Sequence, residues 1–229
     1  MSMKTRRLIA GNIALLLLAA VAAQAADQMT VYRAVPGGKM RIDGTANVLH
    51  TSWQIASPII GGMMEVGPNF PTEPGQAVTP GKLDAKASAF IIVNSLKSVN
   101  EDGTPYSDHM DEIMREHLKE AQYKRIFYRL DELTLKEAPK TKDAPYVCEA
   151  KGDLTIAGVT NKTTMTVNIL PLPDKKLQIT GNTAVKMTDY KVAPVDINLL
   201  IGHIKTGDEV KLVFKWMLAP RRSPATAAK

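Results

Sequence analysis

The sequence predicts an all-β protein, an antiparallel barrel of eight strands interrupted by one short helix. Most of the chain between residues 39 and 218 alternates apolar and polar residues with a period of two. One segment alone shows helical spacing, and the chain contains neither an internal repeat nor a linker that would divide it. Because side chains of a strand point alternately to opposite faces, each alternating segment has one apolar face and one hydrated face.

The first 25 residues have the composition of a cleavable signal peptide. Three basic residues precede a mainly apolar run over 8–23, and Ala23-Gln24-Ala25 offers the small residues that a signal peptidase accepts. We expect cleavage between Ala25 and Ala26 and therefore a periplasmic or secreted protein. The alternative is a retained membrane anchor, but the uninterrupted apolar core over 13–23 is well short of the roughly 20 residues of a spanning helix.

The mature part is predicted to be a single barrel domain over 26–219, followed by a disordered tail over 220–229. Long amphipathic strands joined mostly by hairpins favour a closed or nearly closed barrel, and a two-sheet sandwich is the alternative. The proline-containing segment 68–80 is expected to be a loop. The predicted strands, after an extended lead over 29–35, are 40–42, 49–55, 83–93, 126–135, 146–156, 164–169, 177–187 and 210–218.

The predicted helix covers about 107–123. Its apolar residues Met110, Ile113, Met114, Leu118 and Ala121 recur at helical spacing. Ser or Asp at the first positions can cap it, and the acids that follow lie favourably in its first turn.

Composition narrows the possible functions. The formal net charge of +6 falls to +3 without the signal peptide, and no block of Lys or Arg is present, so nucleic-acid binding is not predicted. Cys148 is the single cysteine and cannot form an internal disulfide. Its place in a predicted strand favours a small buried side chain over a nucleophile. No second apolar stretch is long enough to span a membrane.

No catalytic motif is visible. The sequence contains no G-x-S-x-G, no P-loop and no G-x-G-x-x-G, and its four histidines show no paired ligand spacing. Asp108, His109, Asp111 and Glu112 cluster at the helix start, where they form either a weak metal site or a charged helix N-terminus, and we favour the second. We expect no enzymatic activity, no cofactor and no metal.

The inward faces supply the candidate binding residues. A barrel of this size is either packed solid or hollow around an apolar ligand. The alternation alone favours a packed core, whereas the eleven methionines favour an adaptable apolar pocket. The candidate residues for an apolar cavity are Leu49, Trp53, Ile91, Val93, Met110, Met114, Leu118, Phe127, Met165, Val185, Phe214 and Trp216.

Several motifs follow the order found in one family. Gly152–Thr160 reads G-D-L-T-I-A-G-V-T and resembles the G-x-L-T-I-x-G-V-T signature of YceI-like proteins. The resemblance covers about 39–218, with Lys124 and Lys191 standing where the family usually has Pro and Gly. The other matching segments are Arg41-Ile42-Asp43, Asn94–Ser98, Met114–Phe127, Thr188-Asp189-Tyr190 and Gly207–Val210.

The resemblance implies a lipocalin-like eight-stranded barrel in the periplasm that holds a long isoprenoid chain without catalysis. The expected partner is thus an isoprenoid-type lipid or a quinone-like amphiphile. Two other functions remain open on the sequence. One is a packed barrel that acts as an envelope-stress or assembly partner, and the other is an enzyme for lipid head groups that would use Asp108, His109 and Asp111.

Overall fold

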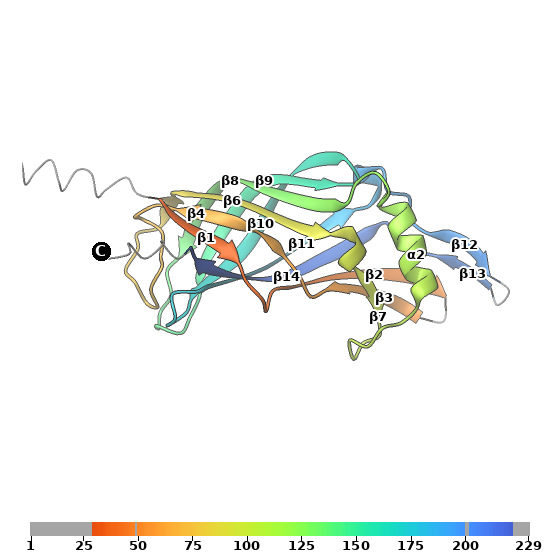
Figure 1. Ribbon diagram of the computed structural model, residues 1–229, viewed down its shortest axis with the longest axis horizontal. Coiled ribbons are helices and arrows are strands. Elements are labelled where there is room, and N and C mark those ends of the chain that lie inside the picture. The colour runs from red at the N-terminus through yellow and green to blue at the C-terminus, as the bar shows by residue number, and fades with distance from the viewer. Residues whose placement is uncertain (1–28, 49, 200–201, 222–229) are drawn as a thin grey trace, which may run out of the picture.

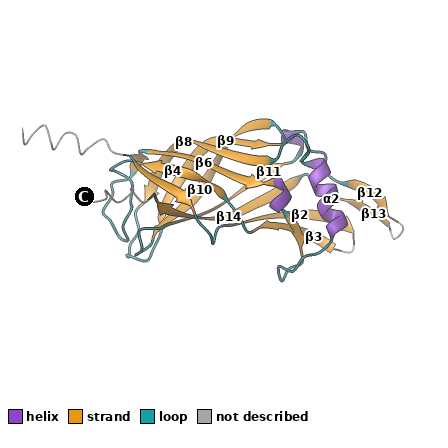
Figure 2. Ribbon diagram, in the orientation of Figure 1, coloured by secondary structure: helices purple, strands orange, loops and turns teal. Residues whose placement is uncertain are grey.

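The computed structural model describes residues 29–48, 50–199 and 202–221. It shows an elongated barrel with α2 (Asp108–His117) lying across one end and a two-stranded hairpin projecting beside the helix (Figures 1 and 2). The predicted signal peptide and most of the predicted tail lie outside the described residues. None of the described helices is long and apolar enough to cross a membrane.

Eight strands form a closed antiparallel ring. The pairing order is β1, β4, β6, β8, β9, β10, β11 and β14, and β14 pairs again with β1. This closure confirms the predicted barrel and rules out the two-sheet sandwich. The ring strands are β1 (Thr30–Ala34), β4 (Gly61–Val66), β6 (Ala85–Ile92), β8 (Arg125–Glu137), β9 (Tyr146–Ile156), β10 (Val159–Pro171), β11 (Leu177–Lys186) and β14 (Glu209–Pro220).

Three neighbouring strands of the ring are broken and continue beyond the break. The turn at Pro36-Gly37 separates β1 from β2 (Lys39–Val48), and 58–60 separates β3 (His50–Ser57) from β4. The short helix η1 (Val93–Ser95) separates β6 from β7 (Lys97–Val99). Before its break, β6 pairs with both β4 and β8, whereas β7 pairs with β3 alone. The wall therefore opens between β7 and β8, and α2 lies at this end of the barrel.

The alternation predicted from the sequence corresponds to burial. Along β9 the residues Tyr146, Cys148, Ala150, Leu154 and Ile156 are all buried, while most of the intervening ones are partly exposed. Their inward side chains build the hydrophobic core, and burying apolar surface is worth about 25 cal/mol per Å². The apolar side chains that point into the barrel are thus the main source of its stability.

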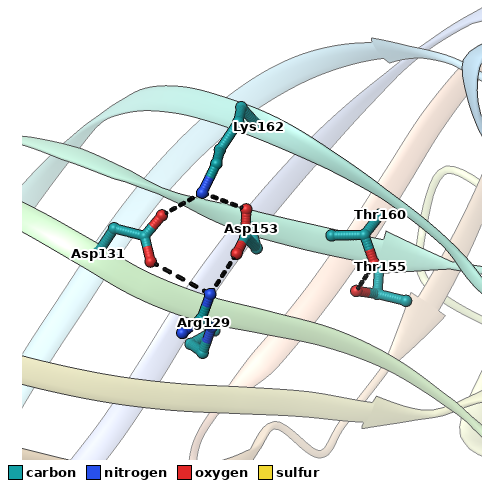
Figure 3. A network of polar contacts seen from close by, with 6 residues as sticks. All are labelled: Arg129, Asp131, Asp153, Thr155, Thr160 and Lys162. Atoms are coloured by element: carbon teal, nitrogen blue, oxygen red, sulfur yellow. Dashed lines mark hydrogen bonds and ion pairs between the residues drawn. The ribbon is translucent and has the colours of Figure 1, made fainter.

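The outer wall carries a network of opposite charges across three strands (Figure 3). Arg129 of β8 lies 2.5 Å from Asp153 of β9, and Lys162 of β10 lies 2.6 Å from Asp131 and 2.7 Å from Asp153. Hydrogen bonds from Lys162 and Arg129 lower the pKa of Asp153. Because the basic partners are exposed, water screens these pairs, and their main effect is to keep this face hydrophilic.

The predicted loop over 68–80 lies at the end of the barrel opposite α2 (Figure 1). Phe70 and Pro71 are buried there, and the Tyr146 hydroxyl donates to the Gln76 carbonyl at 2.5 Å. The side chain of Gln76 accepts in turn from the backbone amides of Thr72 and Glu73. This end is therefore filled by the loop's own side chains.

The sequence missed several short elements. These are β4, β7, β5 (Gly81–Leu83), η2 (Thr188–Tyr190) and the hairpin of β12 (Asp196–Leu199) and β13 (Gly202–Lys205). The helix is also shorter than predicted, because Lys119 takes a left-handed conformation with φ of 55° just after the C-cap Leu118. Lys191 has the same φ of 55°, a left-handed conformation that glycine adopts more readily than other residues.

Candidate ligand cavity

A large cavity lies inside the barrel at the end covered by α2, and we call it the mouth cavity. Its volume is about 930 Å³, near the upper end of the range of about 300–1,000 Å³ for small-molecule sites. The broken strands explain its position, because β2, β3 and β7 continue past the point where β6 leaves β8. The remaining walls come from α2, the ends of β9 and β11, the segment from Met187 to Val195, and the start of β14.

The wall of the mouth cavity is apolar inside and polar at its rim. Ile42, Leu154, Ile156, Val210 and Leu212 are buried lining residues. The exposed polar residues of the lining come from β3 and from the segment before and within α2, and they are Ser52, Asn100, Glu101, Tyr106 and His109. An amphiphile fits this arrangement, since its chain can replace water along the wall while its head stays near the rim.

The helix α2 covers the cavity with its apolar side. Met110, Ile113, Met114 and Leu118 all line the cavity. Ser107 caps the helix, because its side-chain oxygen accepts from the Met110 amide at 3.3 Å. The helix thus replaces the missing strand pairing between β7 and β8 with a layer of side chains.

A buried carboxylate fixes the start of this helix to β7. Asp111 is 2% exposed, and its Oδ1 accepts from the Ser98 amide at 2.6 Å while Lys97 Nζ lies 2.9 Å from Oδ2. Burial by itself raises the pKa of Asp111, but the hydrogen bonds from Ser98 and Lys97 outweigh it and the pKa is lowered. Asp111 is therefore a charged anchor of the helix and is not free for chemistry.

The other end of the helix is held by His117. Its Nδ1 lies 2.8 Å from the carbonyl oxygen of Ala193. Because a carbonyl oxygen only accepts, Nδ1 donates, and the Nε2 of the neutral ring carries the free lone pair. His117 lines the mouth cavity, so this ring joins the cover of the cavity to the segment beside it.

A smaller cavity of about 120 Å³ lies deeper in the barrel, and we call it the inner cavity. Met40, Ile126, Leu154 and Leu212 line both cavities, so the two adjoin. Most of its remaining wall is apolar. Two polar atoms of residues in this wall, Tyr128 Oη and Trp216 Nε1, are buried without a hydrogen-bond partner among the described residues.

Aromatic rings lie flat against the wall where the neighbouring strand has a glycine. A Cβ added to Gly44 would lie 2.1 Å from Trp53, and one added to Gly181 would lie 2.7 Å from the Phe214 ring. Both are direct cross-strand pairs. Because the rings occupy the space that a side chain would fill on the paired strand, they take less of the interior. These pairs help to keep the barrel hollow.

The structure brings most of the predicted cavity residues together. Trp53, Met110, Met114, Leu118 and Val185 line the mouth cavity, and Ile91, Met165, Phe214 and Trp216 line the inner cavity. Val93 is buried in η1 and is not among the residues lining either cavity. Leu49 lies outside the described residues. Contact of these side chains with a ligand stays a prediction.

The side chain of Phe127 does not point inward, as the sequence predicts it to do. Although it borders the inner cavity, its side chain is 44% exposed and its ring packs against Phe90, with 6.2 Å between the centroids. The neighbouring residues Ile126 and Tyr128 occupy the inward positions of β8. The pattern was ambiguous because both faces of the strand carry large apolar residues at this point.

Several lining residues were missed by the sequence analysis. Met40 and Ile42 lie in a segment that was expected to be a strand, and the alternation of its apolar residues was the available signal. Tyr190 ends η2, and Val192 and Val195 follow it in an irregular segment. No periodicity predicts where such a segment lies.

The residues considered for catalysis or metal binding do not come together in one site. The Asp108 side chain is 97% exposed, His109 is exposed, and Asp111 is occupied by Ser98 and Lys97. In the described part of the chain, no three His, Cys, Asp or Glu side chains are grouped as ligands for a metal. Burial raises the pKa of the Cys148 thiol to about 12, so its reactive thiolate is scarce at neutral pH.

Comparison with known proteins places this architecture in a family. The family model described as the YceI-like domain matches residues 38–218. The fold is similar to that of a polyisoprenoid binding domain from Saccharophagus degradans, with a TM-score of 0.57 and 11% identity over 85% of this chain and 100% of that chain. It is also similar to BcnA from Burkholderia cenocepacia, with a TM-score of 0.52 and 12% identity over 78% of this chain and 95% of that chain.

None of the curated protein sequences matches this chain. At such low identities the two structural neighbours establish the fold alone. The family model, however, extends from the start of β2 nearly to the end of β14 and so includes the whole wall of both cavities. The protein belongs to the YceI-like domain family.

Proposed function

We propose that the protein is a non-enzymatic binding protein that holds a polyisoprenoid or a similar amphiphilic lipid, such as a quinone-like one, inside the barrel. The observation that carries this proposal is the mouth cavity of about 930 Å³, which is apolar inside, polar at its rim and continued by the inner cavity. A packed barrel acting only through its surface would not need this volume. The structural neighbour from Saccharophagus degradans is a polyisoprenoid binding domain, which supports the same ligand class.

We further propose that the protein works in the periplasm or outside the cell. The support is the N-terminal sequence, which combines a basic start, an apolar run and small residues before Ala26. In that location an apolar chain needs a carrier to leave a membrane, because its transfer into water is unfavourable. N-terminal sequencing of the mature protein from its host should find Ala26 at the start.

Mass spectrometry of lipids bound to the purified protein tests the proposed function. Protein isolated from its native host should release a long-chain lipid on organic extraction, in an amount close to one molecule per chain. The delipidated protein should bind prenyl alcohols or prenyl quinones again. Protein without any extractable lipid and without affinity for added prenyl lipids would contradict the proposal.

A further inference from the structure

The two cavities have a lining that is poor in positive charge. Among the side chains that the structure describes, no Lys or Arg lines the mouth cavity or the inner cavity. The sequence over 48–51 and 197–204, where most side chains are not described, also contains no Lys or Arg. Lys97, which precedes the lining residue Ser98, is already paired with Asp111 at 2.9 Å.

The rim is instead acidic. Five acids and no Lys or Arg occur between Val99 and Glu112, the segment that forms one side of the mouth. Glu101 itself lines the cavity and is exposed. Proteins that bind phosphate groups normally supply Arg, Lys or a cradle of backbone amides, because an unpaired anion loses more hydration than it regains. Among the lining side chains that the structure describes, the only basic groups are the imidazoles of His109 and His117.

The polar groups that do line the cavities suit an uncharged oxygen. In its neutral form His117 presents the lone pair of Nε2 as an acceptor, because its Nδ1 donates to Ala193. The hydroxyl of Ser52 can donate or accept, and Asn100 offers its Oδ1 as an acceptor, since its Nδ2 donates to Thr104 and Pro105. At the deep end, Tyr128 Oη and Trp216 Nε1 are neutral groups as well. Neither end of the combined space therefore offers a permanently charged Lys or Arg to a phosphate among the described side chains.

From this lining we propose that the bound lipid has an uncharged oxygen head, such as a prenyl alcohol or a prenyl quinone, and that the site discriminates against prenyl phosphates. This inference rests on the proposed function, since it names the class of amphiphile that the cavities select. It holds for both orientations of the lipid, because neither the rim nor the deep end has a Lys or Arg among its described lining side chains.

A pair of lipids with the same chain and different heads tests the inference. Geranylgeraniol and geranylgeranyl diphosphate are titrated into the delipidated protein, and the fluorescence of its two tryptophans is followed, since Trp53 lines the mouth cavity and Trp216 the inner one. The alcohol should bind at least about tenfold more tightly at low ionic strength. The ratio of the affinity for the alcohol to that for the diphosphate should shrink at about 1 M salt, where the screening length is about 3 Å.

Three substitutions sharpen the test. Glu101→Gln removes the acid from the lining and should lower the affinity ratio of alcohol to diphosphate. Glu116→Gln is the control, because it removes an exposed acid of α2 outside the lining and should leave this ratio unchanged. Ser52→Lys places a cation on the rim and should shift the ratio further toward the diphosphate.

The outcomes separate the inference from the proposed function. Equal or tighter binding of the diphosphate to the unmodified protein would overturn the inference and leave a lipid-binding protein. Equal effects of Glu101→Gln and Glu116→Gln would also count against it, because the rim acid would then not act locally. If neither lipid binds, both the inference and the proposed function are wrong.

Discussion

Glycine and an aromatic residue act as one unit in this barrel wall. Gly44 and Trp53 face each other across β2 and β3, and the Trp53 indole also donates to the Thr45 carbonyl at 2.9 Å. The indole is thereby held flat against the wall, in the space that a Cβ on Gly44 would take. Hollowness is thus partly a property of residue pairs and not of the strand pattern.

Gly44→Ala should destabilise the protein by about 1–3 kcal/mol, because the new methyl group would collide with the Trp53 ring 2.1 Å away and force it toward the cavity. Urea unfolding measures the loss. In the background of Trp53→Leu, which removes the ring, the same substitution should cost clearly less, as a double-mutant cycle would show. Equal costs in the two backgrounds would mean that the ring does not depend on the glycine.

Cys148 should be unreactive in the folded protein. Its side chain is fully buried, and burial raises the pKa of the thiol to about 12. Because the thiolate is the reacting form, a thiol reagent such as DTNB at pH 8 should label the native protein far more slowly than a free thiol. In denaturant it should titrate one thiol per chain, the number in the sequence. Fast labelling of the native protein would show that the inner face of β9 is accessible.

The start of the helix α2 depends on a tertiary anchor, Asp111. The Ser107 cap and the apolar spacing could be predicted from local sequence, since both involve residues a few positions apart. The contact of Asp111 with Ser98 could not, because it joins residues on different elements and requires the break of the strand at η1. The early end of the helix could not be predicted either, since it depends on a left-handed backbone at Lys119, a conformation that residues other than glycine rarely adopt.

Asp111→Ala should loosen the helix and leave the barrel folded. The substitution removes the acceptor for the Ser98 amide and the partner of Lys97, at an expected cost of about 1–3 kcal/mol for the unpaired buried groups. Faster hydrogen exchange of the Met110–Leu118 amides, measured by NMR, is the expected result. Asp108→Ala is the matched control, because Asp108 also lies near Lys97, at 3.8 Å, but is exposed.

The same anchor should make helix docking sensitive to acid. The folded protein lowers the pKa of Asp111, whereas in the unfolded chain the pKa is about 3.9. The stabilisation is therefore complete above the unfolded value and is lost as the pH falls through the folded value. The NMR signals of the helix should shift below about pH 4 in the native protein and not in Asp111→Ala. Identical acid transitions in both proteins would assign the effect to other carboxylates.

At the scale of the whole molecule, the barrel was predictable and its hollowness was not. The period-two pattern over β9, β10 and β14 identifies the inward face without reference to any partner. The volume left inside depends on the side-chain volumes summed over all strands, on the Gly–aromatic pairs and on the aligned breaks at Gly37, 58–60 and η1. The breaks hid β4 and β7 as well, because Gly61-Gly62 and the short Lys97–Val99 segment carry little alternation.

The junction between the two cavities should set the length of chain that the protein accepts. Leu154 lines both cavities and is 5% exposed. Leu154→Trp should obstruct the junction, so that geranylgeraniol loses about tenfold in affinity or more while the shorter geraniol still binds in the mouth cavity. Leu212→Phe, at the same junction, provides a milder second variant if overpacking of about 1–3 kcal/mol unfolds the first. Val185→Phe is the control, because Val185 lines the mouth cavity and is not among the residues of the inner one. Competition against tryptophan fluorescence measures each affinity, and an unchanged preference for chain length in both junction variants would show that a bound chain does not pass from one cavity into the other.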